Sequence, residues 1–246
     1  MDSDRKLTKK EKKELRKLEW QEKQKSELRN EKFKKYSIWG AAILVVLLAI
    51  GGLMWIVSQP APSQAVAVNV APISSRDITN GNKGAPVTLI EYADFECPAC
   101  AAYHPIVNQI LSTYGKKIYY VYRMFPLENI HPNAVISAQA AYAAWKQGAF
   151  FQYDDLLFNN QNDWASLSDP RSVFISYAKQ LKLNVTQFTA DMNSQEAQNY
   201  VKASENEALS EGMDATPTFV LNGQKLTNPS SLQAFEQLIN AQINKK

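Results

Sequence analysis

The chain contains only two cysteines, in the order Cys97-Pro-Ala-Cys100, shortly after a β-rich apolar run at Val87–Ala93. This order predicts a strand followed at once by a helix, with the cysteines in the first helical turn. Pro98 favours a helix start there, because a backbone N–H at the first helical position would have no acceptor within the helix. No further cysteine is present to build a structural disulfide framework, so we expect the pair to do redox work on its own.

The position at a helix start gives the two cysteines different expected roles. A thiolate is the attacking species, and an ordinary cysteine with a pKa of about 8.5 is only slightly ionised at neutral pH. Free backbone N–H groups and the helix dipole stabilise an anion at a helix N-terminus. We therefore expect Cys97 to form the mixed disulfide with a partner and Cys100, one turn later, to resolve it.

Strand and helix signals alternate along residues 87–246, which predicts an α/β domain interrupted by a helical insertion at about residues 131–211. Asn222-Gly223 predicts a two-residue hairpin turn. The expected strands are 87–93, 117–124, 218–221 and 225–227, and the expected helices are 98–114, 134–147, 150–159, 171–181 and 230–243. Residues 58–86, rich in Pro, Ser, Asn and Gly, are expected to form a linker with one short strand at 65–70.

The front of the chain has the pattern of a membrane anchor. Within residues 36–57, the 21 residues from Ser37 to Val57 carry no charge, and a helix of this length spans about 30 Å of hydrocarbon. A cleaved signal peptide has a shorter apolar region, and a buried soluble helix is rarely so long without a charge. The positive-inside rule then places residues 1–35 in the cytoplasm and the α/β domain outside.

Charge is distributed unevenly along the chain. Residues 1–35 carry 14 Lys and Arg against 8 Asp and Glu, which is net +6, while residues 36–246 carry 13 against 16, which is net −3. The basic excess therefore sits in one short charged segment and does not favour nucleic-acid binding.

Three further features lie near the cysteine pair in the sequence. Glu91 stands inside the apolar strand, either at an edge facing solvent or as a partly buried carboxyl that moves protons to and from Cys100. Pro105 either kinks the helix 98–114 or ends it. Thr216-Pro217 directly precedes a strand, where a cis bond facing the cysteines or an ordinary loop proline would each account for it.

Four segments in this order resemble the DsbA-like thiol–disulfide oxidoreductases of the thioredoxin superfamily: FECPAC, YRMFPL, HPNAVISAQAAYAAWKQGAFFQYDDLLFNNQ and ATPTFVLNG. The resemblance covers roughly residues 85–225. It implies a thioredoxin fold with an inserted helical domain, lying outside the cytoplasmic membrane. It also implies a cis-proline opposite the redox pair at Thr216-Pro217, a buried acidic position at Glu91 and a helix-kinking proline at Pro105.

The same resemblance implies a function. The anchored form resembles the membrane-bound oxidases of Gram-positive bacteria, which implies that the chain donates its disulfide to reduced exported proteins or peptides. A membrane quinone-linked thiol oxidase is then expected to reoxidise it, and no cofactor, metal or nucleic acid is expected. One residue departs from the family pattern, because Ala99 stands where the founding members have a histidine that helps to stabilise the thiolate. A reductase or isomerase of the same fold therefore stays open.

Two alternatives come from other classes of protein. Cys97, Cys100 and His104 have a Cys-x2-Cys-x3-His spacing, to which His131 would add a fourth ligand of a metal-binding module. A redox-inactive scaffold would instead use the aromatic content for peptide binding. However, Tyr119, Tyr120, Tyr122, Phe150, Phe151 and Phe158 have the periodicity of core residues, and a scaffold would keep its activity without Cys97.

Overall fold

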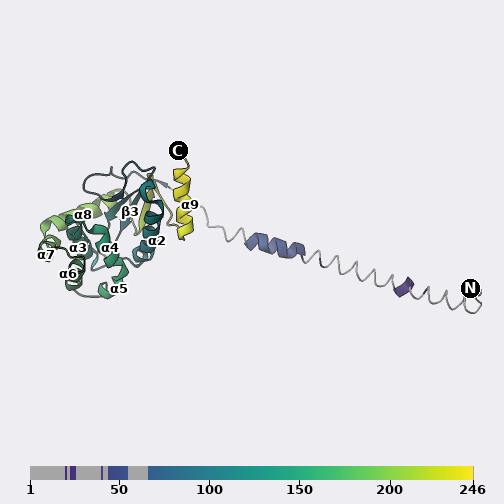
Figure 1. Ribbon diagram of the computed structural model, residues 1–246, viewed down its shortest axis with the longest axis horizontal. Coiled ribbons are helices and arrows are strands. Elements are labelled where there is room, and N and C mark those ends of the chain that lie inside the picture. The colour runs from purple at the N-terminus through teal and green to yellow at the C-terminus, as the bar shows by residue number, and fades with distance from the viewer. Residues whose placement is uncertain (1–19, 21–22, 26–39, 41–43, 55–65, 246) are drawn as a thin grey trace, which may run out of the picture. The chain divides into compact units, whose positions relative to one another are not determined.

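The computed structural model describes residues 20, 23–25, 40, 44–54 and 66–245 (Figure 1). The chain divides into two units, residues 1–61 and 62–246. In the first unit, residues 44–54 are helical. The other residues of the predicted anchor at 36–57, apart from residue 40, lie outside the described residues, as does most of the charged segment 1–35. Among the residues that are described, no helix is long and apolar enough to cross a membrane.

The second unit is built on a six-stranded sheet in the order β1-β6-β5-β3-β4-β2. Its centre is β3 (Val87–Ala93), which pairs in parallel with β4 (Ile118–Met124) and antiparallel with β5 (Thr218–Leu221). Parallel neighbours need a crossover, and helix α2 (Pro98–Tyr114) with the short 3₁₀ turn η1 (Gly115–Lys117) provides it. The outer strands are β1 (Val66–Ala67), β6 (Gln224–Lys225) and β2 (Ile78–Gly81).

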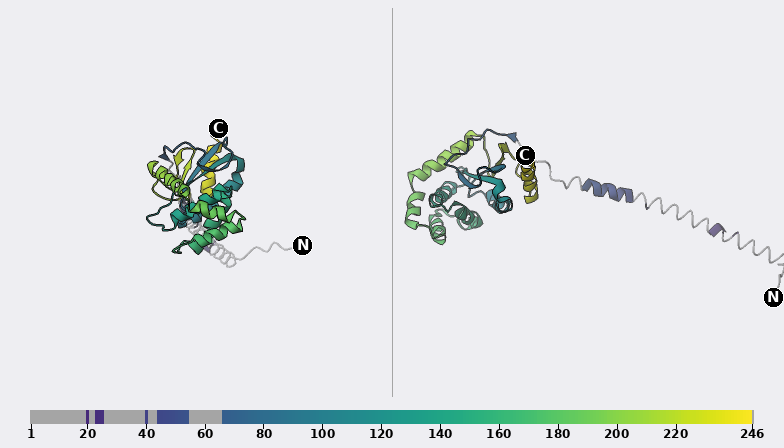
Figure 2. Two further views of the ribbon diagram at one scale, coloured as in Figure 1. Left: turned by 90° about the vertical axis from the view of Figure 1, so that its left-hand side faces the viewer. Right: turned by 45° about the horizontal axis from the view of Figure 1, so that its top comes forward.

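A block of helices is inserted between β4 and β5, as the sequence predicts. Figure 1 shows these helices gathered on one side of the domain, and in both views of Figure 2 they stay together. The inserted helices are α3 (Ala134–Lys146), α4 (Phe150–Asn159), α5 (Gln161–Trp164), α6 (Arg171–Gln180), α7 (Val185–Met192) and α8 (Gln195–Ser210). Helix α9 (Leu232–Ile243) follows the last strand and packs against α2 and β3.

Side chains on the two faces of the sheet enter two different hydrophobic clusters. Because successive strand residues point to opposite faces, Leu89 and Ala93 of β3 enter the larger cluster, formed with α2, α9 and the insertion, while Ile90 and Tyr92 enter the smaller one. Glu91 shares the face of Leu89 and Ala93. The central strand therefore places this carboxyl in the main core, under the helix that carries the cysteines.

The sheet extends into residues 58–86, which the sequence predicts to be a linker. Strand β1 falls within the short strand expected at 65–70, but β2 is not predicted. Its four residues are too few for a periodic signal, and it forms because its backbone pairs with β4, Ile78 lying opposite Tyr122. Gly81 ends β2 with φ 91°, and a Cβ there would lie 2.3 Å from the backbone oxygen of Ile118.

The hairpin predicted at Asn222-Gly223 is confirmed. Both residues have positive φ, 48° and 80°, as a primed two-residue turn requires. The second strand of the hairpin is β6, Gln224–Lys225, one residue earlier and shorter than the predicted 225–227. Helix α2 runs through Pro105 without interruption, so the alternative that the helix ends there is wrong.

Candidate redox site

The two cysteines lie where β3 gives way to α2. Cys97 is the residue that precedes the first helical turn, and its extended backbone (φ −71°, ψ 119°) leaves the first helical N–H groups free. Asp94 holds the connecting loop: its carbonyl accepts the Cys97 N–H at 3.2 Å, and its carboxylate accepts the Glu96 N–H at 2.8 Å. Asp94 thus holds the junction through both its backbone oxygen and its side chain.

The surroundings of Cys97 favour its thiolate. They lower the pKa of Cys97 from 9.0 to about 5, chiefly because the thiol of Cys100 donates a hydrogen bond to it. Partial burial opposes this shift, whereas the backbone N–H groups of Cys100 and Ala99 add to it. At neutral pH the reduced protein thus carries a negative sulfur at the start of α2.

Cys100 has the opposite character. It is fully buried, and both burial and the neighbouring Cys97 raise its pKa well above 9.0. The reduced pair, free of a disulfide in this structure, is therefore a thiolate at Cys97 and a thiol at Cys100. Cys97 retains 7% exposure, and Pro98 and Ala99 beside it are exposed, so a partner approaches the site from their side.

The Thr216-Pro217 bond is cis, as the resemblance implies, and it lies against the cysteines. The Sγ atom of Cys97 is 3.4 Å from the backbone oxygen of Thr216. The Thr216 hydroxyl is buried and has no hydrogen-bond partner among the described residues. Segments that are 119 residues apart in the sequence are thus brought together at one sulfur atom.

Glu91 is buried in the core and does not face solvent, so the expectation of an exposed edge position is wrong. Strand β3 is flanked by β5 and β4, and Glu91 lies opposite Phe219 and Tyr122. Burial raises the pKa of Glu91 from 4.5 to about 7, although the Tyr120 hydroxyl donates a hydrogen bond that opposes the shift. Glu91 in turn raises the pKa of Cys100. A carboxyl that titrates near neutrality is thus coupled to the buried thiol.

The raised pKa of Glu91 predicts a stability that falls with pH. Between pH 4.5 and 7 the unfolded chain releases the Glu91 proton while the folded chain retains it, so the folded state binds more protons and loses stability as the pH rises. The loss approaches about 3 kcal/mol above pH 7, at 1.36 kcal/mol per pKa unit. We expect Glu91→Gln to remove this loss. Urea unfolding of the oxidised chain at pH 5 and pH 9 measures it, and an unchanged pH dependence in the variant would contradict it.

The sequence did not single out two residues that hold the loop of Cys97. Asp94 also accepts the N–H of Leu127 at 2.9 Å and contacts His131 Nδ1 at 2.7 Å. Gln161 of the insertion donates from Nε2 to the backbone oxygens of Phe95 and Cys97, at 2.7 and 3.1 Å. The position of Asp94, three residues before Cys97, is a signal that could have identified it. Nothing near Gln161 in the sequence indicates its role.

The predicted metal alternative at Cys97, Cys100, His104 and His131 is wrong in its geometry. His131 pairs with Asp94, and His104 turns away to Asp155 on α4, 2.8 Å from its Nε2 atom. Over the described ranges, one group has metal-ligand atoms within 4.8 Å of one another: His104, Asp154 and Asp155. Because the Nε2 atom of His104 is already paired with the Asp155 carboxylate, which also accepts from Asn108, we assign this group to hydrogen bonding and not to a metal.

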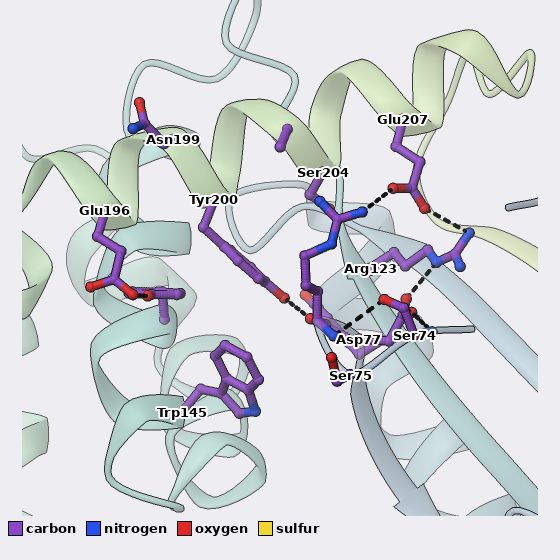
Figure 3. A pocket seen from close by; sticks show the side chains of 14 residues that line it. Ser74, Ser75, Asp77, Arg123, Trp145, Glu196, Asn199, Tyr200, Ser204 and Glu207 are labelled. Atoms are coloured by element: carbon purple, nitrogen blue, oxygen red, sulfur yellow. Dashed lines mark hydrogen bonds and ion pairs between the residues drawn. The ribbon is translucent and has the colours of Figure 1, made fainter. Parts of the chain in front are cut away.

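A separate pocket of about 390 Å³ does not include the cysteines. Figure 3 shows it between residues 74–77 and helix α8, with Trp145 on one side and Glu207 on the other. Glu207 pairs there with Arg123 at 3.3 Å and with Arg76 at 3.7 Å. The redox pair and this pocket are lined by different residues.

Known protein structures share this architecture. The chain is similar to BdbD from Bacillus subtilis in its oxidised form, with a TM-score of 0.64 and 18% identity over 73% of this chain and 99% of that one. It is similar to alpha-DsbA1 from Wolbachia pipientis, with a TM-score of 0.61 and 24% identity over 71% of this chain and 94% of that one.

Curated relatives match a large part of the chain but a small part of their own length. The Na(+)/H(+) antiporter NhaA 3 of Salinispora tropica is 32% identical over 178 residues, which is 72% of this chain and 26% of that protein. The antiporter NhaA of Herminiimonas arsenicoxydans is 35% identical over 150 residues, 61% of this chain and 23% of that protein. The chain thus spans about a quarter of these relatives.

A family model described as thioredoxin matches residues 74–241, which include the whole cysteine site. The match agrees with a strand–helix junction that carries the cysteine pair, a cis-proline beside it and helices inserted after β4. The chain therefore belongs to the thioredoxin family, and its fold is similar to those of BdbD and alpha-DsbA1.

Proposed function

We propose that the chain is an extracytoplasmic thiol oxidase that passes its Cys97–Cys100 disulfide to exported proteins. A substrate thiolate attacks Cys97, the Cys97–Cys100 bond breaks and Cys100 takes up a proton. A second substrate thiolate then attacks the sulfur that is joined to Cys97, closing the substrate disulfide and releasing Cys97 as a thiolate. The substrate loses two electrons and two protons; the enzyme gains both electrons and one proton, and the other proton goes to solvent.

The low pKa of Cys97 is the observation that supports this direction. A thiol of low pKa is a good leaving group, so the last step of disulfide transfer is favoured. Stabilising the thiolate also stabilises the reduced protein, which makes its disulfide more oxidising. The burial of Cys100 keeps the resolving sulfur from reacting with substrates.

A reductase or isomerase is the second candidate, and one residue favours it. Ala99 has no polar side-chain atom, so the thiolate receives only a backbone N–H from this position. A less stabilised thiolate would bring the potential of the pair closer to that of thioredoxin.

The reduction potential distinguishes the two directions. We expect the full-length chain, equilibrated in glutathione buffers, to have a potential nearer to about −120 mV, as for DsbA, than to about −270 mV, as for thioredoxin. The fraction of oxidised chain is read from the intrinsic tryptophan fluorescence, with Cys97→Ser as the blank. A value near −270 mV would contradict the oxidase and favour a reductase.

We also propose that residues 36–57 anchor the chain in the membrane, with residues 1–35 in the cytoplasm. The 21 uncharged residues of this segment support a membrane span, and the lysines before them support the orientation. Reduced exported proteins would then be the substrates, and a membrane quinone-linked thiol oxidase the partner that restores the disulfide. Protease added to intact cells should digest the redox domain and spare residues 1–35; protection of the redox domain would contradict this topology.

A further inference from the structure

A second group of polar side chains lies in the core beside the redox pair, on helices α2 and α4. On α2, His104 stands one turn after Cys100 and is buried. On α4, Asp154 is buried and its Oδ1 atom has no hydrogen-bond partner among the described residues, while Asp155 next to it is 47% exposed. A buried carboxyl with an unsatisfied oxygen is costly and calls for a physical explanation.

Asp154 on α4 is close to His104, with Oδ2 3.5 Å from Nδ1, and near enough to Glu91 for that carboxyl to raise its pKa. Phe150, Asp154 and Phe158 are four residues apart and share one face of this helix. At one end of the face, the Phe150 ring contacts the Tyr122 ring with centroids 5.0 Å apart, and Tyr122 is the cross-strand neighbour of Glu91.

At the other end of this face, the Phe158 ring contacts the His104 ring at a tilt of 34°, with centroids 4.8 Å apart. Asp154 occupies the middle position of this face. The Tyr122 hydroxyl is also buried and without a hydrogen-bond partner among the described residues.

The contacts continue from Asp154 to solvent. The Oδ2 atom of Asp154 is 3.5 Å from Nδ1 of His104, and Nε2 of His104 is 2.8 Å from Oδ1 of Asp155. When the neutral imidazole carries its proton on Nε2, this N–H donates a hydrogen bond to the Asp155 carboxylate. The Nδ1 atom is then unprotonated and can accept a proton from Asp154. Proton transfer at this step requires Asp154 and Nδ1 of His104 to approach closer than 3.5 Å, and the half-exposed Asp155 is open to proton exchange with water.

We propose that Asp154, His104 and Asp155 form the route by which Glu91 exchanges protons with solvent while Cys100 gains or loses its proton. This inference rests on the proposed thiol–disulfide exchange. In reoxidation, the Cys97 thiolate attacks a disulfide and releases one thiolate. The thiol of Cys100 then passes its proton to Glu91. The resulting Cys100 thiolate attacks the Sγ atom of Cys97, forms the Cys97–Cys100 bond and releases the second thiolate. The Glu91 proton leaves through Asp154, His104 and Asp155.

The titratable groups around this route are consistent with proton transfer. Burial raises the pKa of Asp154 well above 3.8, and Glu91 and Asp155 raise it further, so Asp154 carries a proton under conditions where an exposed aspartate does not. Burial lowers the pKa of His104, which keeps the imidazole neutral and able to accept. From β4, Tyr120 and Tyr122 face the same carboxyls with their pKa raised well above 10.0.

The test measures the lifetime of the mixed disulfide. Reduced full-length chain is mixed with oxidised glutathione, quenched with acid at increasing times and analysed by mass for the glutathione adduct. We expect Asp154→Asn to lengthen the adduct's lifetime about tenfold or more, and Glu91→Gln to lengthen it at least as much. The exposed Asp163→Asn on α5 is the matched control and should leave the lifetime unchanged.

Two further measurements separate a proton route from a packing effect. Because the groups act in series, the double variant Glu91→Gln/Asp154→Asn should be no slower than Glu91→Gln alone, whereas independent defects would multiply. The absorbance titration of Cys97 should stay unchanged in Asp154→Asn. A normal lifetime in Asp154→Asn, or multiplicative slowing in the double variant, would overturn the route and leave the proposed function standing. A wild-type chain that oxidised glutathione does not convert to the Cys97–Cys100 disulfide would overturn the proposed function and the route together.

Discussion

Replacing Cys97 by serine is expected to abolish disulfide transfer, with a loss of at least about a thousandfold in rate. Without the Cys97 sulfur Cys100 has no partner among the cysteines of the chain, so the variant holds no disulfide to transfer, and the serine hydroxyl does not ionise at neutral pH to replace the thiolate. The measurement is the rate at which the oxidised chain converts a reduced model peptide with two cysteines to its disulfide.

The matched control for this prediction is Cys100→Ala. This variant keeps the thiolate and loses only the resolving sulfur, so it should accumulate mixed disulfides through Cys97. Its adducts, detected by mass and released by a reductant, identify the substrates directly. Retention of full activity in Cys97→Ser would support the scaffold alternative, and an adduct on neither variant would contradict the assigned roles.

Truncating Arg123 to alanine should have the largest effect on stability, about 3–5 kcal/mol in the free energy of unfolding. Arg123 lies on β4 with its guanidinium buried, and it pairs with Asp77 at 2.8 Å and with Glu211 at 3.1 Å. Figure 3 shows it beside Asp77 and Glu207 at the wall of the pocket. Removal of one partner leaves carboxylates buried without a cation, which costs more than the pair itself contributes.

Arg123 also joins segments that are distant in the sequence. It donates to the Tyr92 hydroxyl and to the backbone oxygen of Ala71, each at 2.9 Å, and so connects β3 with the segment before β2. Arg171 is the matched control, because its pair with Asp169 is half-exposed and its loss should cost about 1 kcal/mol or less. Urea unfolding of both variants measures the difference. An equal loss of unfolding free energy in the two variants would contradict the prediction that the buried ion pairs of Arg123 stabilise the domain.

The sequence predicted those parts of the fold that have a strong local signal. The apolar run 87–93, the proline at the first helical position and Asn222-Gly223 each reflect a backbone preference of a few residues, and the elements appear where expected. Strand β2 was missed because its four residues show no alternation, and it exists only through its pairing with β4. A strand of this kind is determined by its neighbour.

The candidate site divides in the same way. Cys97 and Cys100 could be found because their spacing and place in the chain are both informative. Glu91 and Thr216-Pro217 stood out as a carboxyl inside an apolar strand and a proline directly before a strand, and the resemblance implied their roles. The contacts of Gln161 with the loop of Cys97, and the place of Asp154 beside His104, depend on how the insertion folds back over α2. Tertiary packing alone creates these contacts, so no local pattern in the sequence indicates them.

Titration of the Cys97 thiolate tests the proposed chemistry most directly. The thiolate absorbs near 240 nm, and the reduced chain is followed from pH 3 to pH 9 with Cys97→Ser as the blank. The structure predicts a transition with its midpoint near pH 5, well separated from any ionisation of Cys100. A midpoint between about 8.5 and 9, the value of a free cysteine, would show that the start of α2 does not stabilise the anion and would contradict the oxidase proposal.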